Sequence, residues 1–185
     1  TSILGVHQRS WLMNGLEPSA AQWNVLAQQV MMANLDRQVG PGVAVSMDKW
    51  AAYELERRDL LNWFNEAQIT NPVVLTGDIH KNYACELLRD FNDLDSSSVG
   101  TEFVGTSISS SGDGFDQPDN IDQLLSENPF LKYHNGERGY VSCTVNQKEW
   151  RTNYRTVPFV SRPNAPLNTR ASFVVESGRS IFNKV

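Results

Sequence analysis

The clearest candidates for chemistry lie in residues 73–80, which read Val-Val-Leu-Thr-Gly-Asp-Ile-His. The apolar run, rich in β-branched residues, predicts a buried strand of the parallel type. Asp78 and His80 would then stand at its carboxyl end, the edge of an open α/β sheet where ligands bind. A carboxylate and an imidazole two residues apart offer an oxygen and a nitrogen ligand to one metal ion. The alternative is an ordinary strand-to-turn junction with His80 on the surface.

A second group of candidate residues follows an expected strand over residues 43–47. It consists of Asp48, Trp50, Tyr53 and Arg57. If the strands at 43–47 and 73–76 are adjacent and parallel, Asp48, Asp78 and His80 share one edge of the sheet. Arg57 lies one helical turn beyond Tyr53 and could face a phosphate with its guanidinium fork. The alternative for Arg57 is a charge on the helix surface.

The elements that would position these residues predict an α/β fold, a βαβ unit followed by a β-rich C-terminal portion. Helices are expected over residues 19–35 and 53–66, with a short one at 121–125. Further strands are expected at residues 83–88, 102–108, 139–145, 150–157 and 172–175. The polar loop at residues 109–120 is expected to be surface rather than a metal site.

Composition limits the possible functions. The chain has 185 residues, enough for one domain or for half of a larger one, and 40% of them are hydrophobic. A net charge of -5 argues against nucleic acid as a specific partner. No apolar run approaches the roughly 20 residues of a transmembrane segment, and no signal peptide is visible. Cys85 and Cys143 lie in strand-like contexts and are expected to be free thiols.

Five motifs, taken in order, resemble the C-terminal half of PhoD-type alkaline phosphatases, which belong to the metallophosphoesterase superfamily. The resemblance covers roughly residues 3–157. The motifs are Gln8-x-x-Trp11-Leu12, Asp48-x-Trp50-x-x-Tyr53-x-x-x-Arg57, the Val-Leu-Thr-Gly-Asp-Ile-His of residues 74–80, the Glu-Phe-Val-Gly-Thr-Ser-Ile-Ser-Ser of residues 102–110, and the Arg-Gly-Tyr-Val of residues 138–141.

The resemblance implies a four-layer αββα sandwich of two mixed sheets with helices outside. It also implies a centre of two or three metal ions, iron with calcium, that hydrolyses phosphate monoesters and diesters. Asp78 and His80 would be catalytic metal ligands, and Asp48, Trp50, Tyr53 and Arg57 would lie near the substrate. Such proteins are commonly exported through a twin-arginine signal, which implies a periplasmic or extracellular location.

Two departures from the family pattern bear on activity. The chain has Ala51-Ala52 where the family often has Asp-Gly, and Glu54 where it often has Pro. The family's other metal-binding motifs, including an Asp-Asp-His stretch, have no match here. Residues 1–185 are therefore interpreted as the C-terminal part of a single metallophosphoesterase domain. Its missing N-terminal half would supply the rest of the active site.

Two other interpretations compete with a phosphoesterase. One is a non-catalytic, β-rich interaction or packing module that retains the family outline, which Ala51-Ala52 modestly favours. The other is a serine hydrolase that uses Ser107. Residues 105–109 read Gly-Thr-Ser-Ile-Ser and so lack the last glycine of a nucleophile elbow.

Overall fold

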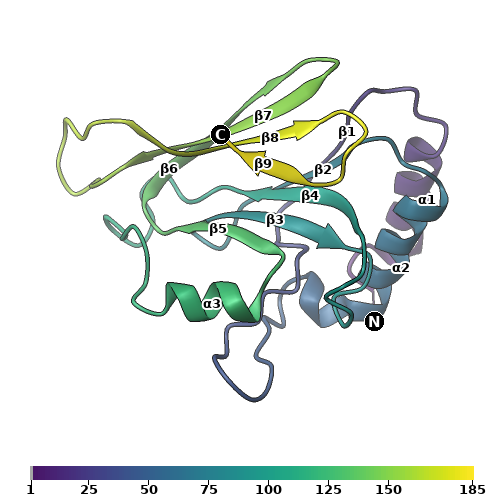
Figure 1. Cartoon of the computed structure of the whole chain (residues 1–185), viewed down its shortest axis with the longest axis horizontal. Coiled ribbons are helices and arrows are strands. Elements are labelled where there is room, and N and C mark those ends of the chain that lie inside the picture. Colours follow the sequence, from purple (N-terminus) through teal and green to yellow (C-terminus); the bar gives the residue numbers. More distant parts are fainter. Residues whose placement is uncertain (1) are drawn as a thin grey trace.

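The computed structural model describes residues 2–185 and contains two stacked β-sheets (Figure 1). The five-stranded sheet has the order β1-β2-β4-β3-β5. Strands β1, β2 and β4 run parallel, whereas β3 is antiparallel to β4 and β5. Its strands are β1 (Asn24–Ala27), β2 (Pro72–Thr76), β3 (Asn82–Leu88), β4 (Ser98–Val104) and β5 (Leu131–Asn135).

The second sheet is antiparallel, with the order β6-β7-β8-β9. Its strands are β6 (Arg138–Val145), β7 (Glu149–Val157), β8 (Asn168–Glu176) and β9 (Phe182–Lys184). Along β7, Trp150, Thr152, Tyr154 and Thr156 are buried and alternate with partly exposed residues. This period of two places one face of the sheet against the five-stranded sheet.

The helices cover the other face of the five-stranded sheet (Figure 1). They are α1 (Gly5–Leu16), the 3-10 helix η1 (Trp50–Tyr53), α2 (Glu54–Glu66) and α3 (Ile121–Glu127). Leu60, Leu61 and Phe64 of α2 are buried against this sheet at helical spacing. A second core lies between the two sheets and includes Phe103, Tyr154 and Phe173.

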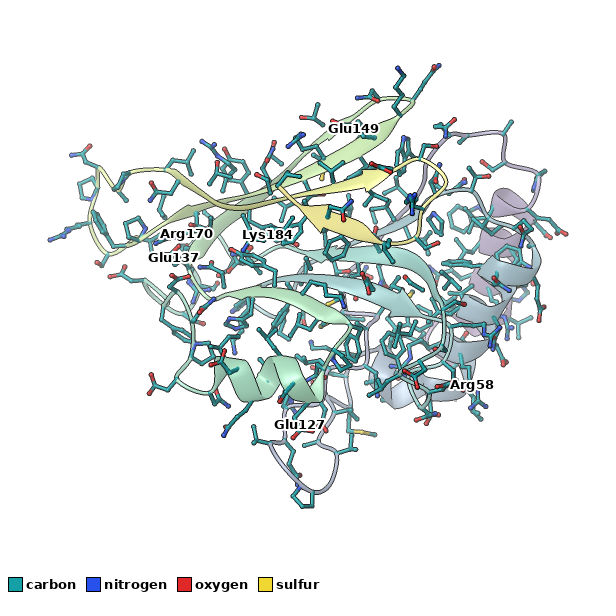
Figure 2. All side chains as sticks on the ribbon, in the orientation of Figure 1. Arg58, Glu127, Glu137, Glu149, Arg170 and Lys184 are labelled. Carbon is teal, nitrogen blue, oxygen red and sulfur yellow. The ribbon has the colours of Figure 1, made fainter. Side chains whose placement is uncertain are left out.

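Glu137 lies where the chain passes from β5 in the first sheet to β6 in the second. It is buried and accepts a 2.6 Å hydrogen bond from the Nε of Arg170 on β8 and a 2.7 Å bond from the hydroxyl of Thr156 on β7. Figure 2 shows the Glu137 and Arg170 side chains side by side. These bonds fix the position of β6 and so of Arg138, its first residue.

The expected helix over residues 19–35 is wrong. Within that range the chain forms only the short strand β1, and the first helix is α1, which has no buried residue. Strand β1 forms because it pairs with β2 in parallel, in the register Asn24 with Pro72. Pairing with a distant strand therefore overrides the helical spacing of the local sequence.

The expected strand over residues 43–47 is also wrong, because this segment is irregular. Backbone and side-chain bonds close a turn there: Arg37 N–H donates to the Ala44 carbonyl at 3.0 Å, and the Asp36 carboxylate accepts bonds from the N–H groups of Gln38 and Ala44. The parallel neighbour of β2 is β1. A βαβ unit does exist, but β1, α2 and β2 form it.

The remaining elements largely follow the prediction. Helices α2 and α3 and strands β2, β3, β6 and β7 are confirmed with small shifts at their ends. Strand β8 begins four residues earlier than expected, and β4 begins and ends four residues earlier. Strands β5 and β9 were not predicted. Cys85 and Cys143 are free thiols, as expected.

The mixed α/β class of the fold is confirmed. Residues 2–185 form three layers, so the expected four-layer sandwich stays a prediction. Among the helices described here, none combines the length and the apolar character needed to cross a membrane.

Candidate functional site

The turn after β2 displays both predicted metal ligands. Asp78 and His80 are exposed, and both have left-handed backbone conformations, with φ of 69° and 55°. This conformation is uncommon for residues other than glycine, although Asp and His adopt it more readily than most. The N–H of Gly77 donates a 3.2 Å hydrogen bond to the Gln29 carbonyl, which ties the turn to the segment after β1. Backbone strain of this kind is concentrated at functional sites.

Lys49 holds the Asp78 side of the turn. Its ammonium forms an ion pair with the Asp78 carboxylate and lies 3.7 Å from a carboxylate oxygen of Asp48. The structure therefore brings Asp48 and Asp78 together, although no strand precedes Asp48. A 2.6 Å hydrogen bond from the Ser46 hydroxyl, together with the Lys49 charge, lowers the pKa of Asp48.

Arg138 holds the His80 side of the turn. Its Nη1 donates a 2.7 Å hydrogen bond to the His80 carbonyl, and its Nε donates a 3.0 Å bond to the Gly112 carbonyl. The His80 Nδ1 lies 3.4 Å from the Ser111 hydroxyl. Among residues 2–185, the Nε2 of His80 has no hydrogen-bond partner, which leaves this nitrogen free to bind a ligand.

Trp50 and Tyr53 belong to η1, which directly follows Lys49, the residue that pairs with Asp78 of this turn. Trp50 is buried, and its indole N–H donates a 2.7 Å hydrogen bond to the Gln28 side-chain oxygen. Its backbone N–H donates to the Met31 carbonyl at 3.4 Å. Tyr53 is half-buried. The structure thus places Trp50 against the segment after β1 rather than on the surface, and its contact with substrate stays a prediction.

Arg57 is 2% exposed, so the alternative of a surface charge is wrong. Its Nη1 donates a 3.0 Å hydrogen bond to the Asn34 side-chain oxygen, and its guanidinium lies over the Phe91 ring, 4.9 Å from the centroid. Burial lowers the pKa of Arg57 to about 10. A role of Arg57 in phosphate binding stays a prediction, because its described contacts lie within the interior.

Sequence reasoning missed three residues that shape the site: Lys49, Arg138 and Glu102. Glu102 and Arg138 were noted only as parts of motifs. Glu102 is fully buried and accepts hydrogen bonds from Met32 N–H, Ala33 N–H and the Thr76 hydroxyl. A lone acid within an apolar strand was the available signal. Lys49 and Arg138 gave no such signal, because their partners are distant in sequence.

Ser107 has none of the surroundings of a catalytic nucleophile. Its hydroxyl donates a 3.0 Å hydrogen bond to the Ser110 carbonyl and accepts one from Arg138 Nη1 at 3.1 Å. Within the part of the chain described, no histidine hydrogen bonds to it. The serine hydrolase interpretation therefore has no geometric support.

Asp78 and His80 have donor atoms that suit a metal ion, an exposed carboxylate and an exposed imidazole at one strand end. Metals in proteins take four or more ligands. Among residues 2–185, no three His, Cys, Asp or Glu side chains gather closely enough to form a metal site. The role of Asp78 and His80 as metal ligands stays a prediction.

Comparison with known proteins identifies the class of fold first. The solved structure titled "Structure of PhoD" superposes on this chain with a TM-score of 0.93 at 43% sequence identity, and the match covers 99% of this chain and 35% of that one. The sequence profile of the family described as PhoD-like phosphatase matches residues 1–154, and the chain belongs to this family.

A curated relative agrees with this assignment. The chain is 43% identical over 184 residues to alkaline phosphatase D of Bacillus subtilis (strain 168). The alignment covers all of this chain and 32% of that protein, and it falls in the C-terminal portion of the relative. The resemblance inferred from the five motifs is confirmed. The chain spans about a third of the length of these relatives.

Proposed function

We propose that this chain is part of a phosphatase in which Asp78 and His80 hold a catalytic metal ion. The observation that carries the proposal is the turn after β2, where Asp78 and His80, two residues apart and both exposed in left-handed conformations, follow the carboxyl end of a parallel strand. Membership of the PhoD-like phosphatase family and the name of the relative, alkaline phosphatase D, support the reaction class.

The chemistry follows from the donor atoms. A bound metal ion polarises a phosphoryl oxygen and lowers the pKa of a coordinated water. In this chain, the Asp78 carboxylate would balance the charge of such a cation and the His80 imidazole would supply a nitrogen ligand. Arg138 keeps His80 in place through its backbone carbonyl. The family resemblance implies iron and calcium, and we propose these two metals, since iron accepts imidazole ligands and calcium accepts carboxylates.

The substrates we propose are phosphate monoesters and diesters. Asp48, Trp50, Tyr53 and Arg57 would border the substrate site. The structure supports this for Asp48, which is exposed and 3.7 Å from the Lys49 ammonium. For Trp50 and Arg57 the supported contribution is indirect, since both fix the segment at residues 28–34 behind the turn.

The active site would be completed by a segment outside these residues. A binuclear centre needs on the order of six to eight protein ligands, and the turn offers two. The same segment would add the outer layer of a four-layer sandwich. Its existence is supported by the relative, of which this chain covers 32%. A periplasmic or extracellular location is proposed from the family resemblance alone.

The test uses two substitutions in the intact protein that contains this chain. His80→Ala and Asp78→Asn should each lower kcat and metal content by about 10–100-fold or more and leave the circular dichroism spectrum unchanged. Cys143→Ser is the control, because this half-buried thiol packs in β6 and should affect stability rather than turnover. Normal metal content and turnover in His80→Ala would refute the assignment.

A second measurement separates this proposal from the serine hydrolase interpretation. A chelator should abolish hydrolysis of a chromogenic phosphate ester, and a serine-reactive phosphonate should not. The opposite pattern would favour Ser107.

A further inference from the structure

We propose that the Lys49 ammonium competes with a metal ion for the Asp78 carboxylate and so weakens metal binding at this residue. The inference rests on the proposed function, since it places the metal at Asp78. It begins from the ion pair between the Lys49 ammonium and an Asp78 oxygen, the atom type that would bind the cation.

Lys49 is not an ordinary surface lysine. The residue is 8% exposed and precedes η1, where its carbonyl accepts a 3.0 Å hydrogen bond from Ala52 N–H. Together with Asp78 it borders a cavity of about 220 Å³. The rest of the wall is mainly apolar but also includes two polar residues: it is formed by Met31, Ala33, Leu35, Ala51 and Ile79 with Arg37 and Ser46. A charged group in such surroundings is costly unless it is paired. Asp78 provides that pairing.

A metal ion and the ammonium compete for this carboxylate. The ammonium binds only one oxygen, Oδ2, but a divalent cation at the Asp78 carboxylate would stand close to the Lys49 charge, and the two like charges repel strongly in a partly buried site. Metal binding is therefore favoured when the ammonium leaves Asp78. Its departure costs part of the binding free energy, so Lys49 weakens the apparent affinity of the site.

Asp48 provides the alternative partner for the displaced ammonium. A carboxylate oxygen of Asp48 already lies 3.7 Å from the Lys49 nitrogen, and the Asp48 side chain is 76% exposed. The cavity beside Lys49 gives its flexible side chain room to move. The ammonium can thus pass from Asp78 to Asp48 without becoming unpaired.

The experiment measures Mn²⁺ affinity by isothermal titration calorimetry on the intact, chelator-treated protein. Lys49→Met should bind Mn²⁺ about tenfold more tightly or better, because one competing unit charge at contact distance is gone. Lys49→Gln should behave similarly and serves if the Met variant folds poorly. Lys132→Met is the matched control, since its ammonium pairs with Glu86 at 3.3 Å, three strands away from β2, and it should change nothing.

Asp48 tests the transfer step through a double-mutant cycle. Asp48→Asn should weaken Mn²⁺ binding severalfold in the wild-type background, because the displaced ammonium then has no partner. In the Lys49→Met background the same change should have little effect. An equal loss in both backgrounds would show that Asp48 acts on the metal directly, and would overturn the transfer.

Other outcomes would overturn the competition itself. Weaker Mn²⁺ binding by Lys49→Met would mean that Lys49 holds Asp78 in its ligand orientation, and unchanged binding would mean that the ammonium does not compete. If Asp78→Asn leaves Mn²⁺ binding intact, the metal does not bind at Asp78, and Lys49 cannot compete with it there. Mn²⁺ binding that depends on Asp78 without any ester hydrolysis would refute the proposed function and leave the competition standing.

Discussion

The hydroxyl of Thr76 donates a 2.7 Å hydrogen bond to the carboxylate of Glu102 in the interior of the molecule. The same carboxylate accepts hydrogen bonds from the backbone N–H groups of Met32 and Ala33, at 2.7 and 2.8 Å. Glu102 therefore joins the end of β2, the strand β4 and the segment after β1. Asp78 follows Thr76 by two residues. The buried Glu102 carboxylate therefore fixes the backbone from which the candidate site projects.

Replacing Glu102 by Gln should destabilise the fold by about 2–4 kcal/mol. The amide would turn one acceptor into a donor that faces an existing N–H or O–H donor. Burial raises the pKa of Glu102, while its three hydrogen bonds oppose that shift. Urea unfolding of the chain measures the effect. Glu86→Gln is the control. It should cost under about 1 kcal/mol, because Glu86 pairs with the exposed Lys132. Equal stability of the two variants would refute the role of Glu102.

The elements that were predicted correctly are those in which the element's own residues show the full pattern of buried and exposed positions. Helix α2 has its own apolar stripe, and β7 alternates buried and partly exposed residues along its whole length. Strand β1 has four residues and exists because β2 lies beside it. Helix α1 has no buried face at all, so its sequence carries no stripe to detect.

Site residues could be predicted from the sequence where the residue type itself suggests a chemical role. Asp78 and His80 stand out because a carboxylate and an imidazole close a buried strand. Lys49 and Arg138 act through partners 29 and 58 residues away, and no local pattern encodes such contacts. Arg57 shows the converse, since a charge expected to face phosphate or solvent packs on Phe91 instead.

Acid should destabilise the fold through His134. This side chain is 1% exposed, and neither ring nitrogen has a hydrogen-bond partner within the described residues. Burial, helped by the charge of Lys81, lowers the pKa of His134 to about 4. Between pH 6.5 and 4 the unfolded chain binds a proton that the folded chain does not. Stability should therefore fall over this window, by about 3 kcal/mol in total.

His134→Phe should remove this part of the pH dependence. The Tyr83 and Phe115 rings lie 5.2 and 6.5 Å from the imidazole, so an aromatic ring fits its surroundings. Urea unfolding at several pH values should show a flatter curve above pH 4 for this variant. The exposed His7 provides the control, because His7→Gln should leave the wild-type curve unchanged. An unaltered slope in His134→Phe would contradict the assignment.

Two glycine substitutions should have opposite effects. Gly139, the second residue of β6, has a φ of 157°, and a Cβ there would lie 2.0 Å from the Arg155 carbonyl oxygen. Gly139→Ala should therefore destabilise the chain by about 2–4 kcal/mol. Gly15, inside α1, has nothing within 4 Å of its Cβ position, and Gly15→Ala should stabilise by about 0.5–1 kcal/mol. Thermal unfolding followed by circular dichroism distinguishes the two, and a stable Gly139→Ala would refute the close contact.

The last prediction concerns the strain at His80. Its φ of 55° is unfavourable for any residue with a Cβ, so His80→Gly should be more stable than His80→Ala by about 1 kcal/mol. At Lys81, which follows in an ordinary conformation, the order should reverse, with Gly less stable than Ala by about 0.5–1 kcal/mol. Urea unfolding in the presence of a chelator measures all four variants without any contribution from metal. Both His80 variants should bind metal far more weakly than the wild type, because the imidazole is gone. If His80→Gly and His80→Ala are equally stable, the left-handed turn is not strained, and the cost at this site would no longer point to selection for metal binding.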